Sequence, residues 1–237
     1  MNYTKQQLMK GGYRIEYEII YSSRKTLEIA VHPDSSVVVT APVNTPVDII
    51  KQKVVKRIKW IDKQQQYFQQ FQPRSVQKQY LRGESHLYLG KHYRLKVISG
   101  LREEIKLKHG YFVVSVRDKE DRARVKNLLE EWYIERAKVK LDEYFKICWV
   151  KFSSKDPIPP IFKIRKMKKR WGSLSKGGTL TLNTELIKAP KECIEYVITH
   201  ELCHTIHHNH SEKFYRLLKQ VMPDWEKLKN KLELSMS

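Results

Sequence analysis

The chain has 237 residues, of which 41% are hydrophobic and 30% are charged, as is typical of a soluble globular protein with one large or two small domains. Its formal net charge at pH 7 is +20, and residues 185–237 hold eight acidic and eight basic side chains, so the whole excess lies in residues 1–184. No signal-peptide core occurs in residues 1–13 and no apolar run approaches about eighteen residues, so neither export nor membrane spanning is expected.

Residues 1–116 are predicted to form a β-rich region that contains one long helix. Residues 46–71 form an amphipathic pattern rich in Lys and Gln, which predicts that helix. Its candidate core positions are Ile49, Ile50, Val54, Ile58 and Trp60. The predicted strands share alternating apolar residues or short β-branched runs that end at Gly or Pro, and they cover residues 13–22, 24–32, 35–41, 87–89, 92–98, 104–108 and 111–116. We see no internal repeat in the sequence.

Residues 117–237 are predicted to be mainly helical and to form a second region, which can also join the first in one compact unit. A long helix is expected over 118–150, and further helices follow Ser211 and Pro223. Residues 179–183 alternate as a strand, which we expect to be an edge strand that leads into the next helix. The predicted class is therefore α+β, with a β-rich first half and a mainly helical second half.

A basic run precedes this strand. Residues 161–170 hold six basic side chains and no acidic one. Such a surface would attract polyanions, which include nucleic acid, nucleotides and acidic proteins. The alternative is a solvated basic face that serves solubility, and the absence of a known nucleic-acid motif leaves both interpretations open.

Five of the nine histidines lie within residues 200–210. If this segment is helical, His200 and His204 project from one face and can hold a divalent metal, while Glu201, about 100° round the helix, can reach a water on that metal. Pro190 and Glu192 suit the first turn of such a helix, although Ala189 is a poor N-cap. A helix that is apolar on nearly all sides is buried, which places the pair in the interior. The alternative is that these histidines are ordinary core or surface groups.

A catalytic zinc needs a third protein ligand and an open position. We rank His210 first, because Asn209 can end the helix in a left-handed conformation and let His210 return over the metal. Glu226 is second, and His207 or His208 is third. Cys203 is offset from the histidine pair and is expected to be a small buried side chain. With Cys148 and Cys193 it forms no disulfide framework, which favours a reducing, cytoplasmic location.

Several motifs in the second region carry a family resemblance that covers most of the chain. They are Arg170–Ser173, Leu180–Asn183, Ile187–Pro190, Tyr196–His204 and Asn209–Ser211 with Phe214. The chain resembles the YgjP-like metallopeptidase family, a relative of the SprT-like and WLM zinc metalloproteases. The resemblance implies a zincin-like catalytic core, His200, His204 and His210 as zinc ligands, and Glu201 as general base. One departure is Leu174, where the family usually has Cys, so no role can be assigned to that thiol.

The sequence therefore predicts a zinc-dependent metallohydrolase, in the first place a metallopeptidase that acts on peptides or proteins. The resemblance also implies an alternative, a nucleoside triphosphate pyrophosphatase that converts UTP to UMP and pyrophosphate. In that alternative the basic run would bind substrate phosphates through Lys163, Arg165, Lys169 and Arg170. A third hypothesis is a DNA-associated binding protein with a structural zinc. Three histidines suit zinc, but they also bind nickel, copper and cobalt.

Overall fold

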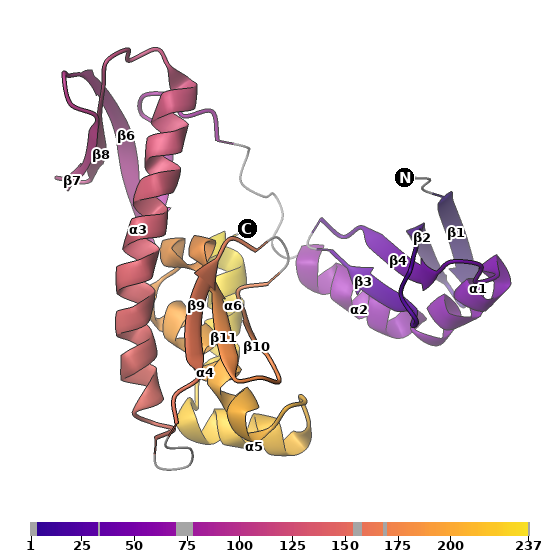
Figure 1. Cartoon of the computed structure of the whole chain (residues 1–237). Helices are drawn as coiled ribbons and strands as arrows, with labels where there is room; N and C mark the ends of the chain where they lie inside the picture. The colour runs from indigo at the N-terminus through magenta and orange to yellow at the C-terminus, as the bar shows by residue number, and fades with distance from the viewer. Residues whose placement is uncertain (1–3, 33, 70–77, 154–157, 168–169, 237) are drawn as a thin grey trace. The chain divides into compact units, whose positions relative to one another are not determined.

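The computed structural model describes residues 4–32, 34–69, 78–153, 158–167 and 170–236 (Figure 1). The chain forms two compact units, Met1–Ser75 and Val76–Met236, and each unit has its own hydrophobic core. This boundary lies about forty residues before the division between the two predicted regions, 1–116 and 117–237. The reason is that the strands of residues 85–116 pack on the long helix that follows them, and their apolar side chains belong to the core of the second unit.

The first unit is a four-stranded sheet with two helices packed against it. The strands lie in the order β1-β2-β4-β3, in which β2 and β4 are parallel and the two outer pairs are antiparallel. Its core is built by alternate strand residues and by one side of each helix, for example Ile19, Val39 and Ile61, all 0% exposed. The elements are β1 (Thr4–Lys10), β2 (Tyr13–Ser22), β3 (Glu28–Val31), β4 (Val37–Pro42), α1 (Val47–Lys56) and α2 (Ile58–Gln69).

The helix predicted for residues 46–71 is two helices, because the chain leaves helical geometry at Arg57, where φ is −106° and ψ is 7°. Ile50, Val54 and Ile58 are buried, as predicted. Ile49 and Trp60 are 44% and 39% exposed, so their assignment to the core was wrong. Both residues lie beside the buried stripe rather than in it, because helical periodicity turns each of them about 100° or more away from its buried neighbours.

The second unit begins with a sheet that repeats the topology of the first. Its order is β5-β6-β8-β7, again with a parallel central pair and two antiparallel outer pairs, and a helix follows the fourth strand in both units. Asp121 caps this helix by accepting a hydrogen bond from the Arg124 amide. The elements are β5 (Ser85–Tyr88), β6 (Lys91–Ser99), β7 (Glu104–Lys108), β8 (Tyr111–Val116) and α3 (Arg122–Trp149).

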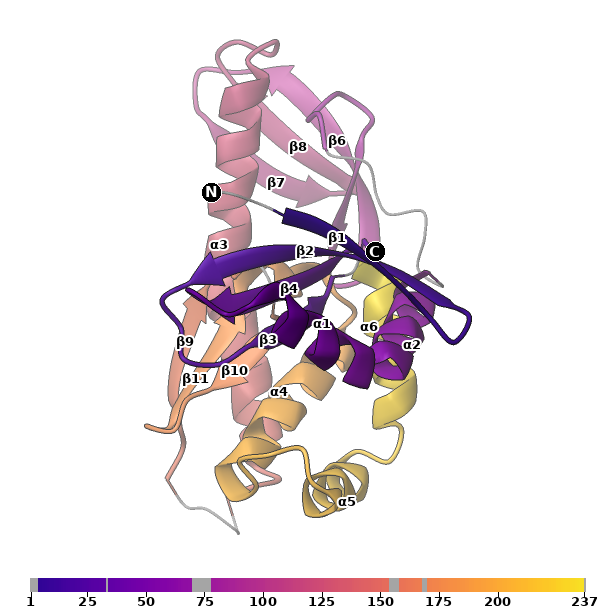
Figure 2. The same cartoon turned by 90° about the vertical axis from the view of Figure 1, so that its right-hand side faces the viewer.

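The rest of the second unit is a small three-stranded sheet with three helices, and α3 packs against these elements as well as against the sheet before it (Figures 1 and 2). The strand order is β10-β11-β9, so β11 is central and the prediction that it is an edge strand was wrong. Strand β9 lies within the basic run and was not predicted. It pairs in parallel with β11, so both edges of β11 are paired. The elements are β9 (Ile161–Arg165), β10 (Gly172–Leu174), β11 (Thr179–Asn183), the 3₁₀ helix η1 (Thr184–Lys188), α4 (Lys191–Ile206), α5 (Glu212–Val221) and α6 (Trp225–Met236).

The turn between β5 and β6 supports the start of α4. The amides of Leu89 and Gly90 donate to the carbonyls of Ile187 and Lys188, both at 3.0 Å. Gly90 has a φ of +77°, and a Cβ at this position would lie 2.8 Å from the Cα of Pro190, so the turn needs glycine for two reasons. Within the described residues, no helix is long and apolar enough to cross a membrane.

Candidate metal centre

Helix α4 carries the first two histidines of the cluster and is packed on nearly all sides. Pro190 stands at its N-cap position, one residue later than the sequence analysis placed the cap, so the helix begins at Lys191. Apolar residues on several faces of the helix, such as Ile194, Ile198 and Leu202, are 0% exposed. His200 and His204 are half-buried, and their ring centroids lie 5.4 Å apart. The helix therefore holds two imidazoles at the wall of a cavity in the second unit.

His210 returns to this pair from the turn between α4 and α5. Its Nε2 lies 2.9 Å from the Nε2 of His200, and its ring centroid lies 4.6 Å from that of His204. The helix ends at Ile206 because His207 adopts an extended conformation with φ −127°. Asn209 does not have a positive φ, so the prediction that a left-handed Asn209 ends the helix was wrong.

Phe214, which is fully buried on α5, supports all three rings. Its ring centroid lies 5.0 Å from that of His200, 4.6 Å from that of His204 and 4.7 Å from that of His210. An aromatic ring that contacts all three imidazoles restricts the orientation of each of them. Phe214 thus acts as a common packing surface for the cluster.

The donor set fits a divalent metal ion. One ring nitrogen from each of the three histidines can be chosen so that all lie within 4.8 Å of one another. Ligands of a tetrahedral zinc, with bonds of about 2.0–2.1 Å, lie about 3.3 Å apart. The Nδ1 of His204 is 2.9 Å from the carbonyl oxygen of His207, and because a carbonyl only accepts, Nδ1 carries the proton and Nε2 keeps its lone pair. Burial, with the neighbouring histidines and Lys229, lowers the pKa of His200 to about 3, so this ring is neutral and able to ligate at pH 7.

Glu201 lies beside these ligands on α4, and its side chain is held against β10. Its side chain is 9% exposed, and burial raises its pKa to about 7, although the Leu174 amide and the Arg170 charge act in the opposite direction. A Cβ on Gly172 would lie 2.8 Å from the Glu201 Cγ and 3.1 Å from its Oε1. Only a glycine lets β10 approach the carboxylate so closely.

The cavity around these groups has a volume of about 550 Å³. One wall is β10, which is an edge strand of its sheet, and another is formed by α6. Three cationic residues line it, Arg170, Lys176 and Lys229. Its other lining residues are Trp171, Gly172, Ser173, Leu174, Ser175, Tyr196, Val197, His200, Glu201, His204, His208, His210, Leu232 and Glu233.

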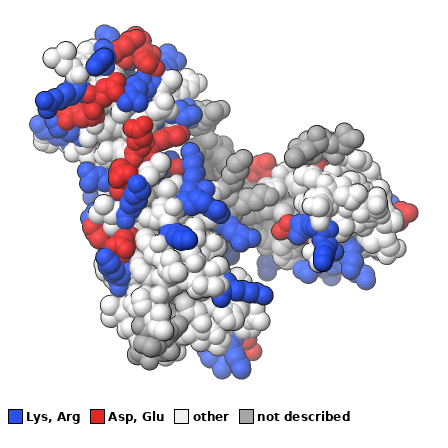
Figure 3. All heavy atoms as spheres, viewed as in Figure 1, with Lys and Arg blue, Asp and Glu red and all other residues white. Residues whose placement is uncertain are grey.

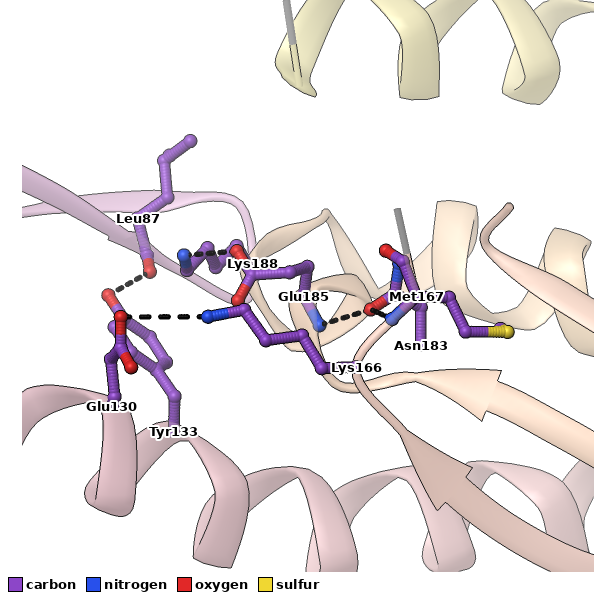
Figure 4. A network of polar contacts seen from close by, with 8 residues as sticks. All are labelled: Leu87, Glu130, Tyr133, Lys166, Met167, Asn183, Glu185 and Lys188. Atoms are coloured by element: carbon purple, nitrogen blue, oxygen red, sulfur yellow. Dashed lines mark hydrogen bonds and ion pairs between the residues drawn. The ribbon is translucent and has the colours of Figure 1, made fainter. Parts of the chain in front are cut away.

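Asn183 fixes the segment that enters this wall (Figure 4). It lies at the end of β11 and is 4% exposed. Its Nδ2 donates to the carbonyls of Met167 and Arg170, at 2.8 and 2.9 Å, and its Oδ1 accepts from the amides of Met167 and Glu185, both at 3.2 Å. One buried amide therefore ties the chain before β10 to the turn that leads into α4.

A family model described as "YgjP-like, metallopeptidase domain" matches residues 25–235. The chain belongs to the YgjP-like metallopeptidase family. It therefore carries the metallopeptidase domain of a hydrolase family, and the resemblance drawn from its motifs is confirmed.

The chain is similar to the metallopeptidase zymogens abylysin of Pyrococcus abyssi, with 23% identity and a TM-score of 0.35, and jannalysin of Methanocaldococcus jannaschii, with 25% identity and a TM-score of 0.34. Each alignment covers 38% of this chain, and 90% and 85% of those chains respectively. No match is found among curated proteins.

The ranked candidates for the third metal ligand differ in whether they lie near His200 and His204. Glu226 is exposed on α6 and does not line the cavity. His208 lines the cavity, and His207 contributes its carbonyl to orient His204, but neither belongs to the group that can hold a metal. Cys203 is fully buried and is also outside this group, as expected for a small side chain that packs in the core.

The residues predicted to bind substrate are not gathered at one place. Arg170 lines the cavity. Lys163 and Arg165 are exposed on β9, at the opposite edge of the sheet from β10, and do not line it. Lys169 lies outside the described residues. Sequence reasoning did not single out Lys229, because a lysine on the exposed side of an amphipathic helix carries no signal of a site.

Proposed function

We propose that this chain is a zinc-dependent metallopeptidase in which His200, His204 and His210 hold the metal and Glu201 is the general base. The observation that carries the proposal is the convergence of three imidazoles and one buried carboxylate in a single cavity. Membership of the YgjP-like metallopeptidase family supports it. Three protein ligands suit a catalytic zinc, which keeps a position open, whereas structural zinc sites are closed by four. This count, among the described residues, disfavours the hypothesis of a structural zinc.

A bound zinc supplies a Lewis acid, which polarises a carbonyl and makes a hydroxide nucleophile available near neutral pH. Glu201 accepts the proton of the attacking water and returns it to the leaving amine. A pKa of about 7 suits both transfers, because neither protonation state is then strongly favoured at neutral pH. The clamp by Gly172 and the Leu174 amide holds the carboxylate in place for this role.

The edge of β10 that pairs with no other described strand is the proposed binding site for the peptide main chain. An extended substrate can add to an exposed strand edge through backbone hydrogen bonds. Arg170, on the same wall, is the proposed substrate-binding cation. The pyrophosphatase alternative is less well supported, because Arg170 lines the cavity whereas Lys163 and Arg165, the other two described residues assigned to phosphates, do not.

The metal ligands are tested by metal analysis of the purified full chain after zinc loading. Wild type is expected to hold about one zinc per chain, as a site with three protein ligands predicts. His210→Ala is expected to lose most of it, and His208→Ala, which removes a cavity histidine outside the ligand group, is expected to keep it. Zinc retained by His210→Ala, or an absence of zinc in wild type, would refute the ligand assignment.

The reaction is tested with casein and with the four ribonucleoside triphosphates as substrates. Peptide products are expected from wild type, with a loss of about 100-fold or more in Glu201→Gln that still holds zinc. Equal rates for the two proteins would remove Glu201 from the mechanism. Pyrophosphate release from UTP that depends on Glu201, without peptide products, would favour the alternative.

A further inference from the structure

The first unit carries a strongly basic surface that the proposed peptidase does not use. Six cationic side chains lie within thirteen positions of α1, α2 and the break between them, and all six are exposed. Figure 3 shows blue atoms gathered on the side of this unit where Figure 1 draws α2. We call this surface the basic face, and it consists of Lys51, Lys53, Lys56, Arg57, Lys59 and Lys63.

The basic face has few acidic neighbours, because α1 and α2 carry only Asp48 and Asp62. None of its six side chains forms an ion pair within the described part of the chain. Helix α3 shows the contrast, since Lys138, Lys140 and Lys146 each pair with a carboxylate one helical turn away. These three lysines have local partners, whereas the basic face leaves a concentrated positive field exposed to solvent.

An anionic membrane is a poor partner for this face. A helix that lies in a membrane interface buries its apolar side among lipids. Here the apolar side of α1 and α2 is already buried in the core of the first unit, where Ile50, Val54 and Ile61 are 0% exposed. What remains outside is mainly charged and polar side chains, together with the partly exposed Val47, Ile49 and Trp60, which are too few to form a continuous apolar face.

The arrangement favours a polyanion with repeated charges. Lys56 ends α1, and Lys59 and Lys63, spaced i and i+4, lie on one side of α2 away from the buried Ile58 and Ile61. Trp60 is 39% exposed next to Lys59, and an exposed aromatic ring beside cations is a stacking surface for unpaired bases. We propose that the basic face binds nucleic acid, chiefly through its phosphate backbone. This activity is separate from the metal centre and does not depend on its assignment.

The proposal is tested by fluorescence anisotropy of the full chain with labelled 30-nucleotide single-stranded and 30-base-pair duplex DNA over a range of salt. We expect binding whose log Kd rises linearly with log salt concentration. Lys56→Gln/Lys59→Gln/Lys63→Gln is expected to weaken binding by about tenfold or more and to lower the salt slope by about 2 to 3. The control, Lys138→Gln/Lys140→Gln/Lys146→Gln, removes the same net charge from α3 and is expected to change Kd by less than about threefold.

Circular dichroism of both triple variants checks that each remains folded. Equal losses in the two variants would show that only net charge matters and would overturn the proposal. So would tighter binding to phosphatidylserine vesicles than to DNA, or displacement of the DNA by poly-glutamate at equal charge concentration. An absence of binding at 50 mM salt would also overturn it. Loss confined to Lys56→Gln/Lys59→Gln/Lys63→Gln would support it.

Discussion

Gly172 is the residue at which one added carbon would most directly disturb the proposed general base. In Gly172→Ala the new methyl group would lie within about 3 Å of the Glu201 side chain, which must then move. We expect kcat to fall by about 10- to 100-fold, because small misplacements of a reacting group are costly. Zinc content should be unchanged, since the three atoms nearest the added methyl group all belong to Glu201. The measurements are steady-state peptide hydrolysis and metal analysis.

The matched control is Gly177→Ala in the β10–β11 hairpin. A Cβ at Gly177 would meet nothing nearer than the Ser175 Oγ at 3.9 Å, and its φ is not positive. This variant should keep wild-type kcat. If both substitutions reduce kcat alike, the effect belongs to the hairpin as a whole and the clamp on Glu201 is not its cause.

The buried carboxyl of Glu201 also predicts a pH-dependent stability in metal-free protein. Below pH 4.5 it is protonated whether the chain is folded or unfolded, and above about pH 7 it is ionised in both states. Between these values the folded state holds the proton more tightly, so the free energy of unfolding falls as pH rises, by about 3 kcal/mol in total.

Glu201→Gln should remove this loss. Relative to wild type, the chelator-treated variant should gain about 3 kcal/mol in unfolding free energy between pH 4.5 and pH 8. The lowered pKa of His200 acts in the opposite sense between pH 3 and 6.5, but it is present in both proteins and cancels in the difference. Urea denaturation at several pH values measures this, and parallel pH profiles would contradict the prediction.

At the residue scale, sequence spacing predicts much of the site but not its surroundings. His200, Glu201 and His204 follow from helical geometry, and His210 was the first-ranked third ligand. The clamp at Gly172 could not be predicted, because the contact joins a strand to a helix about thirty residues later in the sequence. Long-range contacts of this kind leave no periodic signal.

At the scale of elements, the two β-hairpin turns at Gly90 and Gly110 allow a matched comparison. Both glycines have φ near +80°, but a Cβ at Gly110 would meet nothing within 4 Å, whereas one at Gly90 would lie 2.8 Å from Pro190. Gly110→Ala should therefore cost only the strain of a left-handed alanine, about 1 kcal/mol. Gly90→Ala should cost about 3 kcal/mol and weaken zinc binding, because it also displaces the start of α4.

Thermal unfolding and zinc titration of the two variants measure these effects. Equal destabilisation, with equal zinc affinity, would mean that the β5–β6 turn does not support α4. A loss of zinc affinity confined to Gly90→Ala would show that the turn helps to position the metal centre.

Elements were predicted best where one pattern dominates. Strands β2, β7, β8 and β11 have the predicted bounds, and α3 and α4 agree to within a few residues. Strand β9 was not predicted because two of its three exposed positions, Lys163 and Arg165, are cationic, although Phe162 and Ile164 alternate with them and pack against the core. Its absence from the prediction made β11 seem an edge strand.

At the scale of the whole molecule, the sequence predicts the α+β class but not the division into units. The two four-stranded sheets have the same order and the same pairing senses, yet no repeat is visible in the sequence. A shared topology needs only apolar alternation and turns, which many unrelated residues satisfy. The sheets differ in their helices, because α3 is built into the core of the metal-centre unit while α1 and α2 present the basic face.

The three cysteines of the second unit are completely buried, so the rate at which each thiol reacts with an alkylating reagent reports how often the core around it opens. Burial raises the pKa of Cys148 and Cys193 to about 11, so at pH 8 these thiols are both covered and almost entirely protonated. Alkylation must then wait for a local opening of the core. Because Cys193 and Cys203 lie near opposite ends of α4, their separate labelling rates time the release of the helix at its first turn and at its histidine end.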